Sequence, residues 1–356
     1  MRTASVLVFL AACSTKSSPS QPTDATSGAD AAPVADAPAV VATGLGVVSG
    51  VHDLAACPQG APAGSSCRQL SVTGCPGIET EALDATIAIL PATGTRRGTV
   101  VHFSGGGGET ISATGTPEYQ AAGLLQVYVA WSNTQDLHDW EQTASAGIKT
   151  AACRPATVLR WIFDEPTLHG GSRTTAFCGE GHSGGSAQLG YAIAHYGLAD
   201  YLDYVNEISG PPFARLDLGC DGDAPQTALV CGDTVRTDLP PSVARWENIA
   251  APLTCGSHDV PAAELARWKA DSIAIGGAYA YPKTDVEFFD CTNNATAVTA
   301  MSQVFYQTIA AASGNDPARA GYHCYSAADG CQGEGLGSGG AAAATAALVA
   351  GCVPRH

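Results

Sequence analysis

The sequence predicts an α/β fold built on a mostly parallel β-sheet, and three observations lead to that prediction. From residue 44 onward, short apolar runs of strand length alternate with longer segments whose apolar residues recur at helical spacing. The chain has 356 residues, 45% of them hydrophobic and 14% charged, which is enough to bury one large core. Since no internal repeat is found, one α/β domain over residues 44–356, preceded by a tail, accounts for this length.

The expected elements follow one another in a strand-and-helix alternation. Strands are expected as short apolar runs bounded by turn residues, and helices where apolar residues recur every three or four positions. The expected strands are 68–73, 82–90, 99–103, 126–131, 174–178, 204–208, 284–289 and 321–325, and the expected helices are 148–163, 187–198, 262–274, 298–311 and a final alanine-rich helix ending near residue 352.

Residues 210–260 do not fit this alternation. The segment is rich in Pro, Asp, Gly and Cys and shows little periodicity. We expect an insertion held by Cys220 and Cys231 that forms a lid over a site at the edge of the sheet.

The first 43 residues have the composition of an export signal followed by a tether. Met1 and Arg2 form a short positive start, residues 6–10 are apolar, and Leu-Ala-Ala precedes Cys13. Residues 13–43 contain no aromatic residue and are dominated by Ser, Thr, Pro, Ala and Asp, which predicts a flexible tether. Residues 1–13 resemble a bacterial lipobox. The resemblance implies that residues 1–12 are removed and that lipidated Cys13 anchors the protein to the bacterial cell envelope, at the outer membrane or cell surface; the alternative is an ordinary secretory signal.

Cysteine content and charge narrow the functional classes. Thirteen cysteines without the paired spacing of zinc sites favour disulfides in an oxidising compartment, and twelve remain to pair if Cys13 carries lipid. The formal net charge of −16 argues against a nucleic-acid partner. No later stretch is apolar over the about 18 residues that a transmembrane helix needs.

Residues 181–185 read Gly-His-Ser-Gly-Gly and predict a nucleophile elbow centred on Ser183. An elbow needs a strand, a sharp turn that strains the serine backbone, and a helix whose N-terminus points at the reacting oxygen. All three are expected here in that order. The alternative interpretation is a glycine-rich turn with an incidental serine.

A second glycine-rich segment, residues 102–109, reads His-Phe-Ser-Gly-Gly-Gly-Gly-Glu at the end of an earlier strand. In acyl transfer the oxyanion is met by the N–H of the residue after the nucleophile and by an N–H of such a loop. Gly184 and one of Gly105, Gly106 and Gly107 are the expected donors. A phosphate-binding loop is disfavoured because no G-x-x-x-x-G-K-[ST] pattern is present; a plain flexible turn remains the alternative.

With these two motifs, residues 68–352 resemble the α/β-hydrolase superfamily, particularly its secreted esterases and lipases. The resemblance implies that Ser183 is the nucleophile, that an acid follows the next-to-last strand and that a histidine follows the last one. Asp290 lies nearest the acid position, with Asn residues slightly later where many relatives carry their Asp.

The base is harder to place, since residues 327–334 after the last expected strand contain no histidine. We favour His323, in the last strand, and keep His258, in the expected lid, as the alternative base. Either histidine is equally compatible with a structural role. His195 and His182 are expected to point away from the nucleophile, and His356 is the last residue.

The sequence therefore predicts an exported serine hydrolase that cleaves carboxylic esters through a Ser183 acyl-enzyme, with His323 oriented by Asp290. No metal or organic cofactor is expected. The alternatives are a non-catalytic surface-binding lipoprotein that retains the fold, and an amide or peptide hydrolase using the same triad.

Overall fold

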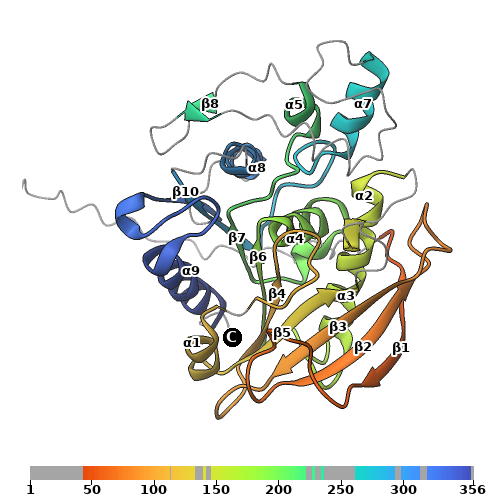
Figure 1. The fold of residues 1–356 in the computed structure, drawn as a ribbon, viewed down its shortest axis with the longest axis vertical. Helices are drawn as coiled ribbons and strands as arrows, with labels where there is room; N and C mark the ends of the chain where they lie inside the picture. Colours follow the sequence, from red (N-terminus) through yellow and green to blue (C-terminus); the bar gives the residue numbers. More distant parts are fainter. Residues whose placement is uncertain are drawn as a thin grey trace, which may run out of the picture. The chain divides into compact units, whose positions relative to one another are not determined.

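A nine-stranded sheet forms the centre of the structure (Figure 1). The computed structural model describes residues 43–112, 114–132, 139–141, 146–221, 227–228, 234–235, 261–292, 298–312 and 319–353. These residues belong to one compact unit, Val40–His356. The expected signal peptide and tether, Cys13, Cys231, His258 and most of the expected insertion lie outside the described residues.

The strand order is β1-β2-β3-β5-β4-β6-β7-β10-β11. The first three pairings, from β1 to β5, are antiparallel, and all pairings from β5 to β11 are parallel. The strands are β1 Val47–Asp53, β2 Ser66–Thr73, β3 Leu83–Leu90, β4 Gly98–Phe103, β5 Leu124–Trp131, β6 Ala176–His182, β7 Tyr204–Ile208, β10 Asp285–Cys291 and β11 Ala320–Tyr325. In this order β5 lies between β3 and β4, although β4 comes first in the chain. This is the strand order of the α/β-hydrolase fold, and the predicted fold class is confirmed.

Helices cover both faces of the sheet. They are α1 Thr116–Ala121, α2 Ile148–Ala151, α3 Cys153–Asp164, α4 Gly184–His195, α5 Leu216–Asp221, α7 Ala262–Asp271, α8 Val298–Ala312 and α9 Gly337–Cys352, with a small two-stranded sheet of β8 Thr227–Ala228 and β9 Thr234–Val235. Helices α1 and α9 lie on one face, and α3 and α4 lie on the other (Figure 1). Among the described helices, none is long and apolar enough to cross a membrane.

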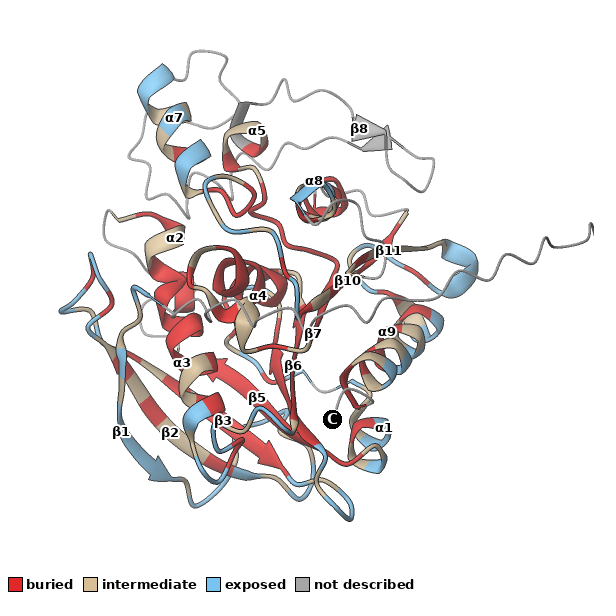
Figure 2. Cartoon of the chain, turned by 180° about the vertical axis from the view of Figure 1, so that it is seen from behind, coloured by how far each residue is buried: buried red, intermediate tan, exposed pale blue. Residues whose placement is uncertain are grey.

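Alternation along the central strands sorts side chains into two cores. Phe177 of β6 belongs to the large core on the face of α3 and α4. The next residue, Cys178, belongs to the smaller core beneath α1 and α9. Because successive strand residues point to opposite faces, central strands covered on both sides are buried along their whole length, as the red strands of Figure 2 show.

Two features differ from the expectation. The predicted helix over 148–163 is divided into α2 and α3, and Pro155 lies in the first turn of α3, where its missing N–H leaves no bond unmade. Strand β1 and helix α1 were not predicted; β1 is largely exposed, so it lacks the apolar pattern that identifies a buried strand.

Disulfides fasten the helices and loops to the sheet. They join Cys57 to Cys67, Cys75 to Cys153, Cys178 to Cys352 and Cys291 to Cys331, and Cys324 is also disulfide-bonded. The Cys178–Cys352 bond links β6 to the end of α9. The Cys291–Cys331 bond links the end of β10 to the loop after β11, so it restrains the segments expected to carry the acid and the base.

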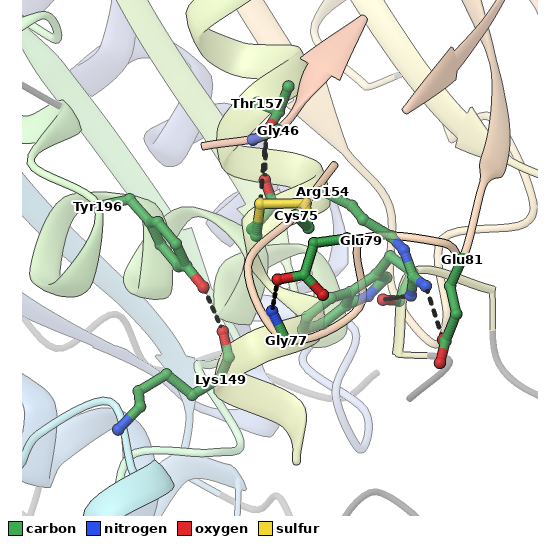
Figure 3. Close-up of a disulfide and its surroundings, with 11 residues drawn as sticks. Gly46, Cys75, Gly77, Glu79, Glu81, Lys149, Arg154, Thr157 and Tyr196 are labelled. Atoms are coloured by element: carbon green, nitrogen blue, oxygen red, sulfur yellow. Dashed lines mark hydrogen bonds and ion pairs between the residues drawn. A yellow bond between two sulfur atoms is a disulfide. The ribbon is translucent and has the colours of Figure 1, made fainter. Parts of the chain in front are cut away.

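The Cys75–Cys153 bond is set among polar contacts (Figure 3). Arg154 is buried and pairs with Glu81 at 3.3 Å, and the Gly46 N–H donates to Thr157 Oγ1 at 2.9 Å. This bond and its neighbours hold the loop after β2 against the start of α3.

Loop length predicts which disulfide contributes more to stability. The sequence separation is 78 for Cys75–Cys153 and 10 for Cys57–Cys67. Since closing a longer loop removes more entropy from the unfolded chain, replacing Cys75 and Cys153 by Ser should lower the unfolding free energy by about 2 kcal/mol more than replacing Cys57 and Cys67. Chemical denaturation of the two double variants measures this difference; equal losses would contradict it.

Candidate functional site

Ser183 lies in a sharp turn between β6 and α4. Its φ is 52° and its ψ is −114°, and with Ser209 it is one of two non-glycine residues of positive φ in the described part of the chain. The Ser183 N–H donates to the Ile208 carbonyl at 2.8 Å, and the Ser183 carbonyl accepts from the Ala187 N–H at 3.2 Å. A strained serine between a strand and a helix has the backbone geometry of a nucleophile elbow.

Glycines flank the turn because backbone from other segments occupies the space of a side chain. A Cβ on Gly184 would lie 2.0 Å from the Gly106 carbonyl oxygen, and one on Gly185 would lie 2.0 Å from the Phe103 carbonyl oxygen. On Gly181, a Cβ would lie 2.5 Å from the Gly185 carbonyl group. The sequence pattern therefore reflects contact between two backbones.

The glycine-rich loop after β4 is packed against this turn. A Cβ on Gly105 would lie 3.4 Å from the Ser183 Cβ. The loop is folded by a Gly108 N–H bond to the Gly105 carbonyl at 3.2 Å and by a bond from the Ser104 hydroxyl to the Thr110 carbonyl. Gly184 is the first residue of α4, so its N–H is not used by the helix. The structure thus brings Gly105, Gly106 and Gly184 to Ser183, with Gly107 next in the same loop.

The loop after β11 reaches the same place. The Glu334 carbonyl accepts from His182 Nε2 at 3.1 Å and from the Ser209 hydroxyl at 2.7 Å. His182 is therefore engaged by this loop, and the residue that contacts the ends of β6 and β7 from the loop is a glutamate.

The structure does not bring His323 and Asp290 together, which corrects the expectation that Asp290 orients His323. His323 Nε2 lies 2.7 Å from Glu287 Oε2, and its ring stacks on Phe289 with centroids 4.6 Å apart. Phe289 and His323 are register partners, so Asp290, the next residue, points to the opposite face of the sheet. The acid partner of His323 is Glu287.

Asp290 is fully buried and accepts a hydrogen bond from the Ser302 hydroxyl at 2.5 Å. Burial raises its pKa to about 8, although hydrogen bonds from Ser302 and Tyr322 act in the opposite direction. Burial also raises the pKa of Glu207 well above its usual value, against a Ser186 hydrogen bond and with a contribution from Asp290. With a pKa of about 8, Asp290 is protonated at neutral pH, whereas an acid that stabilises an imidazolium must be ionised.

No hydrogen bond joins the Ser183 hydroxyl to a side chain within the residues that the structure describes. His195 faces the other end of α4, where Nε2 donates to the Ile273 carbonyl at 3.1 Å, and burial with the nearby Lys149 charge lowers its pKa to about 4. His258, the alternative base, lies outside the described residues.

Sequence reasoning missed a pair beside the elbow, His102 with Glu180, whose Nδ1 and Oε1 lie 3.1 Å apart. His102 is two residues before Ser104, and Glu180 is three residues before Ser183. The two residues are register partners on β4 and β6. The available signal was that His102 interrupts a strand expected to be buried, that Glu180 follows closely after another, and that both residues precede a glycine-rich turn.

The described part of the chain contains no group of three or more His, Cys, Asp and Glu side chains placed to hold a metal ion. The candidate site therefore consists of Ser183, the backbone of the glycine-rich loop and the first turn of α4, with the loop after β11 beside them.

No family model and no curated protein matches this sequence. Among solved structures, acetyl xylan esterase 1 from Thermoanaerobacterium sp. is 11% identical, with 78% of this chain and 80% of that chain covered and a TM-score of 0.48. An esterase from Pyrobaculum calidifontis is 14% identical, with 80% and 84% covered and a TM-score of 0.48. The acetyl xylan esterase from Paenibacillus sp. R4 is 8% identical, with 78% and 81% covered and a TM-score of 0.49. At these identities and TM-scores the likenesses carry no weight for function.

Two glycines of α4 test the contact between the backbones. Gly185→Ala places a Cβ against the Phe103 carbonyl and should lower the unfolding free energy by about 3 kcal/mol or more, because neither backbone can move without opening the elbow. Gly190→Ala meets only the ends of the Ile273 and Phe305 side chains, at 3.3 Å and 3.4 Å, and should change it by less than about 1 kcal/mol. Thermal or chemical denaturation compares them; similar effects would contradict the contact.

The buried Asp290 carboxyl predicts a pH-dependent stability. Its folded-state pKa of about 8 lies above the unfolded value of about 3.9, so its contribution is complete below pH 4 and is lost as the pH rises toward 8. The Asn side chain of Asp290→Asn stays neutral at every pH. The unfolding free energy of this variant minus that of the wild type should therefore increase between pH 4 and pH 8, by up to about 5 kcal/mol. Denaturation across this range measures the gain, with the exposed Asp53→Asn as the control; a difference independent of pH would contradict the prediction.

Proposed function

We propose that this chain is an exported serine hydrolase that cleaves carboxylic esters through an acyl-enzyme on Ser183. The observation that carries the proposal is the strained Ser183 backbone, φ 52° and ψ −114°, held against a glycine-rich loop. Strain of this kind persists only where surrounding structure maintains it, and it is concentrated at functional sites. If the serine were incidental, we would expect either a glycine at this position or an unstrained backbone conformation.

The proposed reaction uses this geometry. The Ser183 hydroxyl attacks the ester carbonyl carbon while a base takes its proton, and the oxyanion is met by the Gly184 N–H and an N–H from Gly105, Gly106 or Gly107. The carbon–oxygen bond to the alcohol breaks, the alcohol leaves with the proton, and water then hydrolyses the acyl-enzyme by the same route.

For the base we propose His258, the alternative from the sequence. His323 is the weaker choice because Glu287 engages its Nε2 and Phe289 stacks on its ring. Asp290 is likewise a weak choice for the acid, because its raised pKa keeps it neutral at pH 7.

A second candidate function is binding without turnover. It is favoured by the loop after β11, which carries Glu334 at the elbow and contains no histidine. Hydrolysis of amides or peptides by the same serine is a further alternative, and it is separated from the ester reaction by comparing matched ester and amide substrates.

Export is part of the proposal. The disulfides of the described residues are compatible with an oxidising compartment, and the lipobox-like residues before Cys13 favour lipid anchoring in the cell envelope.

A fluorophosphonate probe should label the wild-type chain, because the probe captures a serine activated for nucleophilic attack. Ser183→Ala should abolish labelling and reduce p-nitrophenyl acetate hydrolysis by at least about 10³-fold. Labelling is measured by in-gel fluorescence and peptide mapping, and Ser49→Ala, at an exposed serine of β1, serves as the control.

His258→Ala should reduce labelling and hydrolysis to the same extent as Ser183→Ala, whereas His323→Ala should leave labelling in place. The reverse result would transfer the base to His323. A folded wild-type chain without Ser183-dependent labelling would overturn the enzymatic proposal and favour the binding function.

A further inference from the structure

A cavity of about 280 Å³ lies beside the elbow, on the face of the sheet covered by α1 and α9. Its polar lining includes His102, Glu180 and His182, and its apolar lining includes Ile208, Leu336 and Ala341. His182 immediately precedes Ser183, so the cavity adjoins the proposed nucleophile. Its volume is near the lower end of the roughly 300–1,000 Å³ of small-molecule sites, which limits the occupant to a small molecule.

His102 and Glu180 are unusual residues for the interior of a sheet, with 5% and 6% of their surfaces exposed. The His102 ring stacks on Tyr128 with centroids 4.5 Å apart, and its Nδ1 lies 3.1 Å from Glu180 Oε1. Its Nε2 is buried and has no hydrogen-bond partner. A buried polar atom without a partner is costly, and here it belongs to a side chain that lines a cavity.

The protons around Glu180 all point toward its carboxylate. The Tyr119 hydroxyl donates to Glu180 Oε2 at 2.5 Å, and the Asn206 amide donates to the same oxygen at 3.5 Å. Burial acts to raise the pKa of Glu180, but the interaction with His102 and the hydrogen bonds from Tyr119 and Asn206 outweigh burial and lower the pKa. Glu180 is therefore an anion that accepts from each of these neighbours.

The direction of these hydrogen bonds determines whether the cavity lining offers donors or acceptors to an occupant. Glu180 accepts the proton of His102 Nδ1, and no acceptor of the described structure lies within hydrogen-bond distance of Nε2, so we assign Nε2 as the nitrogen that carries the lone pair. Thr345 donates to the Tyr119 oxygen, whose own proton goes to Glu180. The Ser104 hydroxyl donates to the Thr110 carbonyl, which leaves its lone pairs for the cavity. Among the polar groups that line the cavity, His102 Nε2, the Glu180 carboxylate and the Ser104 hydroxyl therefore act as acceptors.

We propose that this cavity binds a small neutral molecule carrying hydroxyl groups, one of which donates to His102 Nε2. An anion is disfavoured by the ionised Glu180 and by the other acceptors in the lining. A cation is disfavoured because three donors already occupy the Glu180 oxygens and much of the lining is apolar. The site does not depend on turnover at Ser183 and goes beyond the proposed ester hydrolysis.

Binding of trans-cyclohexane-1,2-diol to the full chain tests the proposal, with cyclohexanone as a probe of similar ring size that has no donor. The diol should bind saturably and shift the ¹⁵N resonance of His102 Nε2, and cyclohexanone should bind about tenfold more weakly or not at all. Equal affinities for the two compounds, or an unmoved His102 resonance, would overturn the assignment.

Two variants and one control locate the site. His102→Phe keeps a ring on Tyr128 but removes the acceptor, and should weaken the diol about tenfold. Ala341→Leu fills the cavity from α9 without altering a polar group and should abolish binding. Ala342→Leu, at the next, exposed position of α9, should leave binding unchanged. If His102→Phe fails to fold, Ala341→Leu still decides: diol binding that survives in it would refute the site.

Neither probe is an ester, so the result is independent of hydrolysis. Diol binding in a chain without Ser183-dependent labelling would retain this site and reject the proposed enzyme. Labelling at Ser183 without diol binding would support the proposed enzyme and reject this site.

Discussion

The close contact between the Ser183 turn and the glycine-rich loop after β4 is the constraint on which the site depends. Carbonyl groups of Gly106 and Phe103 occupy the positions where side chains on Gly184 and Gly185 would lie. Because the two backbones touch, the serine cannot leave its strained conformation without moving β4 or α4. The same contact places Gly184, whose N–H is not used by the helix, beside the loop.

The alternation of side chains along each strand determines which face of the sheet a residue of the site occupies. In β6, Phe177 and Gly179 face α3 and α4, whereas Cys178 and Glu180 face α1 and α9. Whether a residue stands at an odd or an even position of its strand therefore decides which face its side chain lies on and which side chains it can contact. In the register of β10 and β11, His323 lies opposite Phe289, so Asp290 faces the other side of the sheet. His323 and Asp290 therefore do not pair.

This alternation explains which parts of the site were predictable from sequence. The elbow and the glycine-rich loop were predicted because local backbone geometry restricts their residue types to glycine and serine. The fold class followed from alternating strands and helices. The assignment of acid and base failed to anticipate the contacts of His323 and Asp290, because it depended on register between strands joined by long segments. The His102–Glu180 pair was missed for the same reason: 78 residues separate the two side chains, and only the β4–β6 register brings them together.

Two histidine–carboxylate pairs lie on the α9 face of this sheet, and the choice of ring nitrogen separates their roles. His323 contacts Glu287 through Nε2, its side chain is 43% exposed, and its ring covers Phe289. His102 contacts Glu180 through Nδ1 and is almost fully buried, so its Nε2 is withheld from solvent and from protein partners. Solvent can satisfy the free nitrogen of the first pair, whereas only an occupant of the cavity can satisfy that of the second. A histidine and a glutamate thus form a solvent-exposed hydrogen-bonded pair in one position and an incomplete binding site in the other.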